Sequence, residues 1–339
     1  MTARADTKSV RSIMRKPGDR LNILTFATHE RYEENLCKTG HNFYSLKDGG
    51  KEWDVTYAPI PDNYNIVDSV PSSIDIDIVL SHTSCQRIQI AHDILSRTVG
   101  QFKKITVPIL RHCHVLPDIR FNTEEEIAVY AGIPVDKNSF ISDFNRSAWG
   151  FSNETASVIK HGVDTEFWHP SNTTRTPICL SVVNHFPDRD WCCGFNLWQK
   201  VTNLLPKTVI GQCLYPTFSQ PARDKQELRL AYQQAGLFLN TSIHSPVPTV
   251  MLEAMACGCP VVSTKTCMIP EIIEHGVNGF ISNDPQELEG YCRKILNDSE
   301  LASKMGTAAR KTIEENYNLS TFVENWNNLL YDTIGEFRC

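Results

Sequence analysis

The segment 248–262 places an expected helix start beside a single carboxylate, and both could contribute to a binding site. Pro248 and Thr249 predict the helix start, because proline is tolerated in a first turn and a hydroxyl can cap free amides. Gly258 predicts the helix end, and a valine pair then begins a strand. Free amides at a helix start suit a phosphate, and Glu253, just over one turn later, can accept hydrogen bonds from sugar hydroxyls. The segment therefore predicts a nucleotide-sugar pocket.

Strands and helices that alternate along the chain must position this segment. In the first half, buried strands are expected over 21–26, 42–45, 75–80 and 106–110, with a helix over 32–39. In the second half, strands are expected over 179–183, 208–211, 237–239 and 260–262, with helices over 194–203 and 228–234. This alternation is typical of doubly wound parallel sheets, whose ligands bind beyond the carboxyl ends of the strands. The polar stretches 81–84 and 111–114 are therefore expected to be loops that line a crevice.

Four segments resemble one known family, the family-four retaining glycosyltransferases (glycosyl transferases group 1). They are LEAMACGCPVV at 252–262, IPEII at 269–273, HGVNGF at 275–280 and VIKHGVD at 158–164. The resemblance covers roughly residue 21 to the C-terminus. It implies an α/β protein of the GT-B fold, with two doubly wound Rossmann-like domains that face each other across a cleft.

The resemblance also implies a division of the chain. Residues 21–168 form an N-terminal acceptor domain, preceded by residues 1–20, which their own composition marks as a basic tail. A linker near 164–176 leads to a C-terminal nucleotide-sugar domain over 174–315, and the final helix within 316–339 rejoins the N-terminal domain. The tail is expected to be solvated, or else to form an electrostatic arm for an acidic surface or nucleic acid.

By the same resemblance, Glu253 binds the nucleotide ribose, and the amides of Thr249 and Val250 face the diphosphate. Arg189 offsets the charge on the leaving group, and His114, or His112 in an alternative register, reaches the donor sugar from the N-terminal domain. The remaining assignments are Ser245 and Gly211 for donor binding, and His29 and Glu30 for acceptor binding. No metal site is implied.

The chain departs from the family pattern at two of these places. Ser245 stands where the family has a first glutamate, and Cys193 stands where it has a lysine. Structural roles for the site residues remain open: Thr249 as a simple helix cap, Arg189 as a surface partner of Asp188 or Asp190, and the histidines as ordinary loop residues. The pair Asp188-x-Asp190 also resembles a metal-binding motif of another glycosyltransferase fold, but nothing else here matches that fold.

Length and composition limit the function classes. A chain of 339 residues is expected to hold two domains, and 41% hydrophobic residues is ordinary for a globular protein. The net charge of -6 gives no support to nucleic-acid binding. No Gly-x-Gly-x-x-Gly follows the first strand, which argues against a dinucleotide-dependent dehydrogenase. No transmembrane run or secretory signal is recognised, so the twelve cysteines are interpreted as reduced thiols of a cytoplasmic protein.

The resemblance therefore implies a retaining glycosyltransferase that moves a sugar from a nucleoside-diphosphate sugar, as co-substrate, to a hydroxyl on a glycan or small molecule. No other cofactor and no metal is expected. Two alternatives stay open. One is a transferase that acts on a modified nucleic-acid base, and the other is a nucleotide-sugar-binding relative without catalysis.

Overall fold

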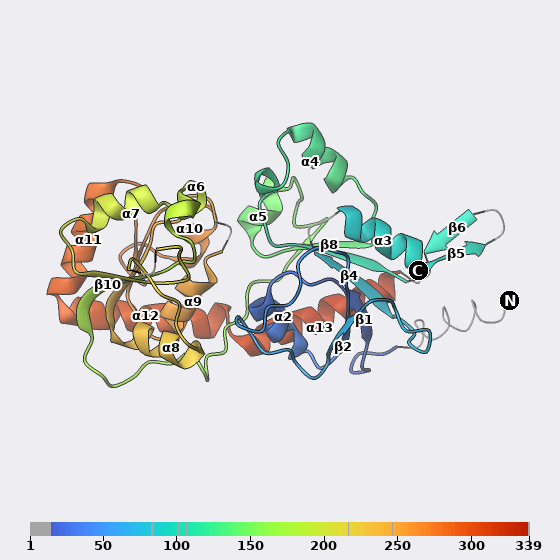
Figure 1. Ribbon diagram of the computed structural model, residues 1–339, viewed down its shortest axis with the longest axis horizontal. Coiled ribbons are helices and arrows are strands. Elements are labelled where there is room, and N and C mark those ends of the chain that lie inside the picture. Colours follow the sequence, from blue (N-terminus) through green and yellow to red (C-terminus); the bar gives the residue numbers. More distant parts are fainter. Residues whose placement is uncertain are drawn as a thin grey trace. The chain divides into compact units, whose positions relative to one another are not determined.

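The computed structural model describes residues 15–82, 85–99, 102–105, 107–215, 217–245 and 247–337. The chain forms two compact units, which are coloured along the sequence in Figure 1. Unit 1 comprises Met1–Gly162 with Ser320–Cys339, and unit 2 comprises Val163–Leu319. The stretch 164–176, expected to be a linker, lies within unit 2, because Trp168 is buried in the core of that unit.

Unit 1 is built on a sheet of seven parallel strands in the order β3-β2-β1-β4-β7-β8-β9. The strands are β1 (Asn22–Thr25), β2 (Asn42–Leu46), β3 (Tyr64–Val67), β4 (Ile78–His82), β7 (Ile109–Cys113), β8 (Lys137–Phe140) and β9 (Ser157–Val158). A separate antiparallel pair joins β5 (Ser96–Val99) and β6 (Phe102–Ile105). The strand order reverses between β1 and β4, which is where open parallel sheets bind ligands.

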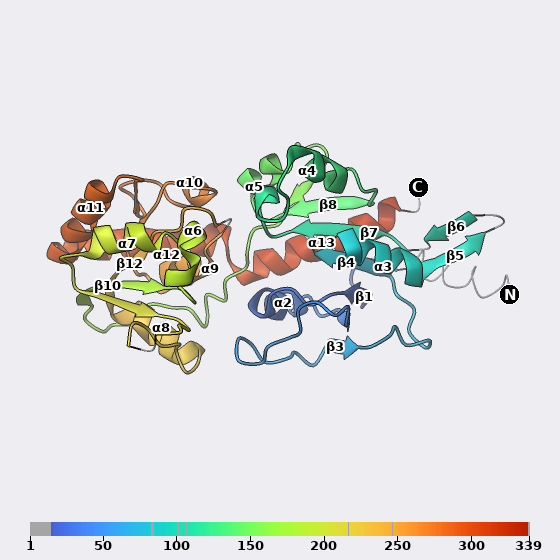
Figure 2. The same ribbon diagram turned by 45° about the horizontal axis from the view of Figure 1, so that its top comes forward.

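Helices pack on the sheet of unit 1. They are α2 (Glu30–Cys37), α3 (Cys85–Leu95), α4 (Glu124–Ala131), α5 (Asp143–Ala148) and α13 (Leu319–Glu336), with the short 3-10 helix η1 (Pro117–Ile119). Ile88 of α3 packs in one apolar cluster with Leu24 and Val79 of the sheet. The C-terminal helix α13 buries a stripe that includes Phe322 and Trp326, and it runs beside α2 in Figures 1 and 2. The end of the chain therefore completes the core of unit 1.

Unit 2 is built on five parallel strands in the order β11-β10-β12-β13-β14. The strands are β10 (Thr176–Val182), β11 (Lys207–Ile210), β12 (Ala235–Asn240), β13 (Val261–Ser263) and β14 (Phe280–Ile281). The helices are α6 (Asp190–Cys193), α7 (Phe195–Thr202), α8 (Lys225–Gln234), α9 (Thr249–Ala256), α10 (Ile269–Ile272), α11 (Pro285–Asn297) and α12 (Ser299–Asn316), with η2 (Pro187–Arg189). Leu180 and Phe238 face one cluster with α8 and α9, whereas Cys179 and Leu237 face another with α7 and α11. This alternation buries both faces of the sheet.

Two expected loops of unit 1 are strand ends instead. Ser81 and His82 belong to β4, and Arg111, His112 and Cys113 belong to β7. All of these residues are buried. The prediction of loops over 81–84 and 111–114 was wrong there, because polar side chains can complete a buried strand when they hydrogen-bond to one another. His112, for example, hydrogen-bonds through Nδ1 to Ser139 Oγ on β8 at 2.7 Å.

Residues 1–14 of the expected tail lie outside the described residues. The rest of the tail is attached to unit 1. The Arg15 guanidinium pairs with Asp77 at 3.0 Å, and the Tyr331 hydroxyl donates to the backbone oxygen of Asp19 at 2.7 Å. In the described part of the chain, no helix combines the length and apolar character that a bilayer span requires.

Candidate functional site

The start of α9 offers free backbone donors in unit 2. Pro248 is the residue before the helix, and its carbonyl accepts the amide of Met251 at 2.9 Å. Among the described residues, the amides of Thr249 and Val250 have no hydrogen-bond acceptor, as expected for a first helical turn. The prediction that the Thr249 hydroxyl caps the helix was wrong, because Thr249 is already the first helical residue and no side chain caps this end. Two amides therefore remain available to an anion.

Glu253 lies on the same helix and is 6% exposed. Its carboxylate accepts a hydrogen bond on Oε2 from the Tyr232 hydroxyl at 3.1 Å. Tyr232 belongs to α8 and is fully buried in the apolar cluster that also surrounds α9. A buried carboxylate needs such donors, and this contact orients Glu253. Tyr232 was not predicted as a site residue, because 21 residues separate it from Glu253 and no local pattern links the two.

The loop between β12 and α9 is fixed by hydrogen bonds to its neighbours. The Thr241 hydroxyl donates to the carbonyl of Cys193 at 3.1 Å. The amides of Ile243 and His244 donate to the carbonyl of Cys192 at 2.9 and 3.1 Å. These bonds bring the loop that carries Ser245 beside α6. Ser245 itself is half-buried and carries no charge.

Arg189 ends η2 next to α6 and is exposed. It forms no ion pair with any described residue, so the predicted surface pairing with Asp188 or Asp190 is absent there. Asp190 instead accepts hydrogen bonds from the amide of Asn196 at 2.7 Å and from its side-chain nitrogen at 2.6 Å, so both carboxylate oxygens are bound at the start of the next helix. Burial raises the pKa of Cys193 to about 12, which leaves a neutral thiol where the family has a cation. Arg189 is therefore the cationic candidate in this segment.

Gly211 follows β11 and serves packing. Its backbone has φ +155°, and a Cβ there would lie 2.0 Å from the carbonyl oxygen of Val183. Its carbonyl accepts the Ser219 hydroxyl at 3.0 Å. The glycine is required by this close backbone approach, and its predicted role in donor binding stays a prediction.

In unit 1, four histidines gather around Tyr32 near the strand-order reversal. This histidine cluster comprises Tyr32, His82, His112, His114 and His161. His82 and His112 are register partners on β4 and β7, and His82 Nδ1 lies 2.8 Å from His114 Nε2. Tyr32 joins the rings, with its hydroxyl 2.9 Å from His112 Nε2 and 3.1 Å from the Trp326 indole nitrogen that donates to it.

The histidine cluster is uncharged. The pKa values of His82, His112 and His114 lie well below the ordinary value. Burial away from water is the main cause, and the neighbouring imidazoles add to it. Burial also lowers the pKa of His161 to about 3. In the part of the chain that the structure describes, no three His, Cys, Asp or Glu side chains are arranged to hold a metal ion. The cluster is therefore suited to hydrogen bonding rather than to charge. His114 and His112 were predicted as site residues from the sequence, whereas His82, Tyr32 and Trp326 were not.

The two predicted acceptor residues differ in their surroundings. His29 is exposed at the residue before α2. Glu30 is 3% exposed, and its carboxylate is already bound, by the Lys51 ammonium at 2.7 Å and by the amide of Asp54 at 3.1 Å. Glu30 therefore holds the segment 51–54 in place.

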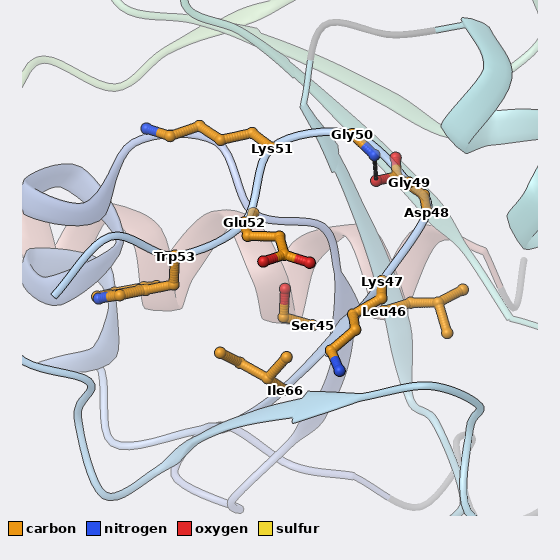
Figure 3. A pocket seen from close by; sticks show the side chains of 11 residues that line it. Ser45, Leu46, Lys47, Asp48, Gly49, Gly50, Lys51, Glu52, Trp53 and Ile66 are labelled. Carbon is orange, nitrogen blue, oxygen red and sulfur yellow. Dashed lines mark hydrogen bonds between the residues drawn. The ribbon is translucent and has the colours of Figure 1, made fainter.

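That segment forms one wall of an open hollow of about 490 Å³, measured with its mouth. The hollow lies at the carboxyl end of β2, between Ala27 after β1 and Ile66 on β3 (Figure 3). In Figure 3 the Glu52 carboxylate points into the space between Trp53, Ser45 and Ile66, whereas the Lys51 ammonium is directed away from it. The carboxyl edge of a parallel sheet is where such folds bind ligands.

Comparison with known proteins gives a family likeness over part of the chain. Residues 217–312 match the sequence model of the glycosyl transferases group 1 family. N-acetyl-alpha-D-glucosaminyl L-malate synthase of Bacillus anthracis is 34% identical over 89 residues, which are 26% of this chain and 23% of that protein. In its matches to the first three curated relatives, the chain spans between 23% and 30% of their length.

Solved structures extend the likeness to the whole fold. Alr3699/HepE of Anabaena, solved in complex with UDP, has a TM-score of 0.70 at 15% identity, covering 93% of this chain and 100% of that one. Sucrose-phosphate synthase of Thermosynechococcus elongatus has a TM-score of 0.72 at 14% identity, covering 94% and 100%. The two parallel-sheet units are thus those of the GT-B fold, as the sequence predicted.

Proposed function

We propose that this member of the glycosyl transferases group 1 family transfers a sugar from a nucleoside-diphosphate sugar to a hydroxyl acceptor, with retention of anomeric configuration. One observation carries the proposal. The open amides of Thr249 and Val250 lie just over one turn before the buried carboxylate of Glu253, on the helix that the family likeness covers. The Anabaena relative was solved with UDP and also with UDP-glucose, which favours a UDP-sugar as the donor.

In this proposal unit 2 binds the donor. The amides at the start of α9 donate to the diphosphate, and Glu253, oriented by Tyr232, accepts hydrogen bonds from the ribose hydroxyls. The bond from the anomeric carbon to the diphosphate breaks, and a bond to the acceptor oxygen forms. Arg189 and the helix amides stabilise the charge that develops on the diphosphate, and a departing phosphate oxygen takes the acceptor proton. No protein base is required, and the diphosphate sugar is the only co-substrate.

Unit 1 binds the acceptor in the same proposal. The neutral imidazole of His114 can donate one hydrogen bond to a sugar hydroxyl or accept one from it. His29 is exposed and available to the acceptor, whereas Glu30 acts through the segment that it holds.

A second candidate function is a nucleotide-sugar-binding protein without turnover. It is favoured by the uncharged Ser245 and by the buried thiol of Cys193, which replace a carboxylate and a cation of the family pattern. Both candidates predict binding of a nucleotide sugar. Only the transferase predicts that UDP is released when an acceptor is supplied.

The test uses the full chain, a panel of nucleotide sugars and Glu253→Ala. A donor at ~100 times its dissociation constant should raise the stability of the wild type by about 2.7 kcal/mol, which a thermal-shift assay detects. Glu253→Ala should weaken UDP binding and reduce nucleotide release by at least about tenfold, the effect of roughly 1.4 kcal/mol.

The matched control is Glu166→Ala, at an exposed glutamate of the same unit. It should behave like the wild type. Wild-type binding and turnover in Glu253→Ala would overturn the site assignment, and donor binding without nucleotide release would favour the second candidate.

A further inference from the structure

Hydrogen bonds and ring packing hold the walls of the hollow in Figure 3 in place. The Trp53 indole donates to the carbonyl of Ala58 at 2.8 Å and packs on Tyr64, with ring centroids 4.6 Å apart. At the other end of the segment, Arg87 donates to Asp48 at 2.7 Å and to the carbonyl of Ala27 at 2.9 Å. A site fixed in this way loses little conformational entropy when a ligand binds.

Each charged residue that lines the hollow, except Glu52, forms an ion pair within the described part of the chain. Lys51 pairs with Glu30 at 2.7 Å, Asp48 with Arg87 at 2.7 Å and Lys47 with Asp68 at 3.0 Å. Glu52 forms no ion pair with a described residue. The pKa of Lys47 is raised mainly by its contacts with Asp68, and the charge of Glu52 adds to this effect. The group aimed into the hollow is thus an unpaired acceptor of hydrogen bonds, and it repels anions.

Apart from Ser45 and two glycines, the remaining lining is apolar or aromatic. Ile66 is 40% exposed and forms an apolar floor. Trp53 is half-buried and supplies a rigid aromatic side. A ring with apolar C–H faces and hydroxyl edges fits this combination, because its faces contact Trp53 and Ile66 while a hydroxyl donates to Glu52.

We propose that this hollow binds an uncharged sugar ring of the acceptor, with Trp53 as the stacking surface and Glu52 as the hydroxyl acceptor. The inference rests on the proposed function and names its acceptor class as a neutral carbohydrate. It disfavours acceptors that carry phosphate next to the bound ring, nucleic acid among them, because Glu52 would face that charge.

The test is ligand-observed saturation-transfer NMR on the full chain. The probes are the methyl glycosides of glucose, galactose and mannose, free N-acetylglucosamine, and glucose 6-phosphate as the anionic comparison. At least one neutral probe should bind, and glucose 6-phosphate should bind more weakly than methyl glucoside. Trp53→Ala should weaken the neutral probe at least fivefold.

Trp191→Ala, at an exposed tryptophan of unit 2, is the matched control and should bind as the wild type does. Glu52→Lys alters an exposed position that can be changed without disturbing the core, so it keeps the test decisive if Trp53→Ala fails to fold. It should weaken the neutral probe and improve the binding of glucose 6-phosphate.

Three results would overturn the inference: no neutral probe binds, Trp53→Ala and Glu52→Lys both bind as the wild type does, or glucose 6-phosphate binds best to the wild type. UDP binding is measured on the same samples. If UDP binds while the sugars fail, only the acceptor inference falls, whereas a wild type that binds no nucleotide counts against the proposed function itself.

Discussion

The imidazoles of His82 and His114 lie with Nδ1 and Nε2 only 2.8 Å apart, so one ring must donate and the other accept. On its other side, His82 Nε2 faces Glu33 Oε1 at 3.7 Å. Neither of these two buried atoms has a hydrogen-bond partner within the described residues. The three side chains therefore lie in one line from the buried acid on α2 to His114, with a hydrogen bond between the two histidines and a longer contact between His82 and Glu33.

The acid at the start of this line is predicted to be protonated at neutral pH. Burial raises the pKa of Glu33 from 4.5 to about 8, opposed by hydrogen bonds from Tyr64 and the Thr28 backbone. The other groups that face it are Glu30, Lys51, Cys37 and His82. Between these two pKa values the folded chain holds one proton more than the unfolded chain. This contribution to stability is therefore complete below pH 4.5 and is lost as the pH rises to about 8.

Glu33→Gln should remove that pH dependence, because the amide keeps the shape of the protonated acid. The wild type should lose about 1.4 kcal/mol of unfolding free energy per pH unit within this window, and the variant should lack this slope. Urea unfolding at a series of pH values measures it. Glu125→Gln, at an exposed glutamate of unit 1, is the control that should keep the wild-type slope. A Glu33→Gln profile parallel to that of the wild type would contradict the prediction.

The proton order along the line is a second prediction. If Glu33 donates toward His82 Nε2, then His82 Nδ1–H donates to His114 Nε2, and His114 carries its own proton on Nδ1. Long-range ¹H–¹⁵N correlation spectra at neutral pH should show His114 in this less common tautomer. His82→Phe should return His114 to the Nε2–H form. An Nε2–H tautomer of His114 in the wild type would show that the line runs the other way.

Local sequence signals predicted the elements but not the contacts between them. The pattern around Glu253 correctly predicted α9 and the strand after it, because the helix end, the turn and the apolar run all lie within fifteen residues. The alternation of strands and helices likewise gave both parallel sheets. By contrast, the pairing of His82 with His112 depends on the register of β4 against β7, which no residue near either histidine specifies.

Two errors have tertiary causes as well. The helix expected over 32–39 spans Glu30–Cys37, and Glu30 can lie buried in its first turn because Lys51 and the amide of Asp54, from a distant loop, bind its carboxylate. The stretches expected to be loops continue as strands because their polar groups bond to neighbouring strands. A polar residue after an apolar run therefore indicates a strand end only when no neighbouring strand offers a hydrogen-bond partner for its side chain.

The hydrogen bond from Tyr232 to Glu253 gives a third prediction. Tyr232→Phe keeps the ring that packs on Trp168 and Phe238 but removes the donor. UDP affinity should fall roughly fivefold, the effect of about 1 kcal/mol for one hydrogen bond. Isothermal titration with UDP measures the change. Tyr317→Phe, at a buried tyrosine of the same apolar cluster, is the control and should retain wild-type affinity. Equal affinities in the two variants would show that Tyr232 does not position Glu253 for binding.

The last prediction concerns Gly194, where the backbone of α6 meets the loop that leads to α9. Its φ is +69°, and a Cβ there would lie 2.0 Å from the carbonyl oxygen of Thr241. Gly194→Ala must therefore both strain the backbone and displace Thr241, whose hydroxyl binds the carbonyl of Cys193. We expect a loss of roughly 2–4 kcal/mol of unfolding free energy and weaker UDP binding.

Gly290 provides the comparison within the same unit. It lies inside α11, and a Cβ there meets nothing within 4 Å. Gly290→Ala should therefore raise the unfolding free energy by about 0.5–1 kcal/mol, as the same change does in other helices, and leave UDP binding unchanged. Urea unfolding and UDP titration of both variants separate the two effects. If Gly194→Ala is as stable as Gly290→Ala and binds UDP equally well, the loop before α9 is not held by this close approach, and the placement of the α9 amides must depend on other contacts.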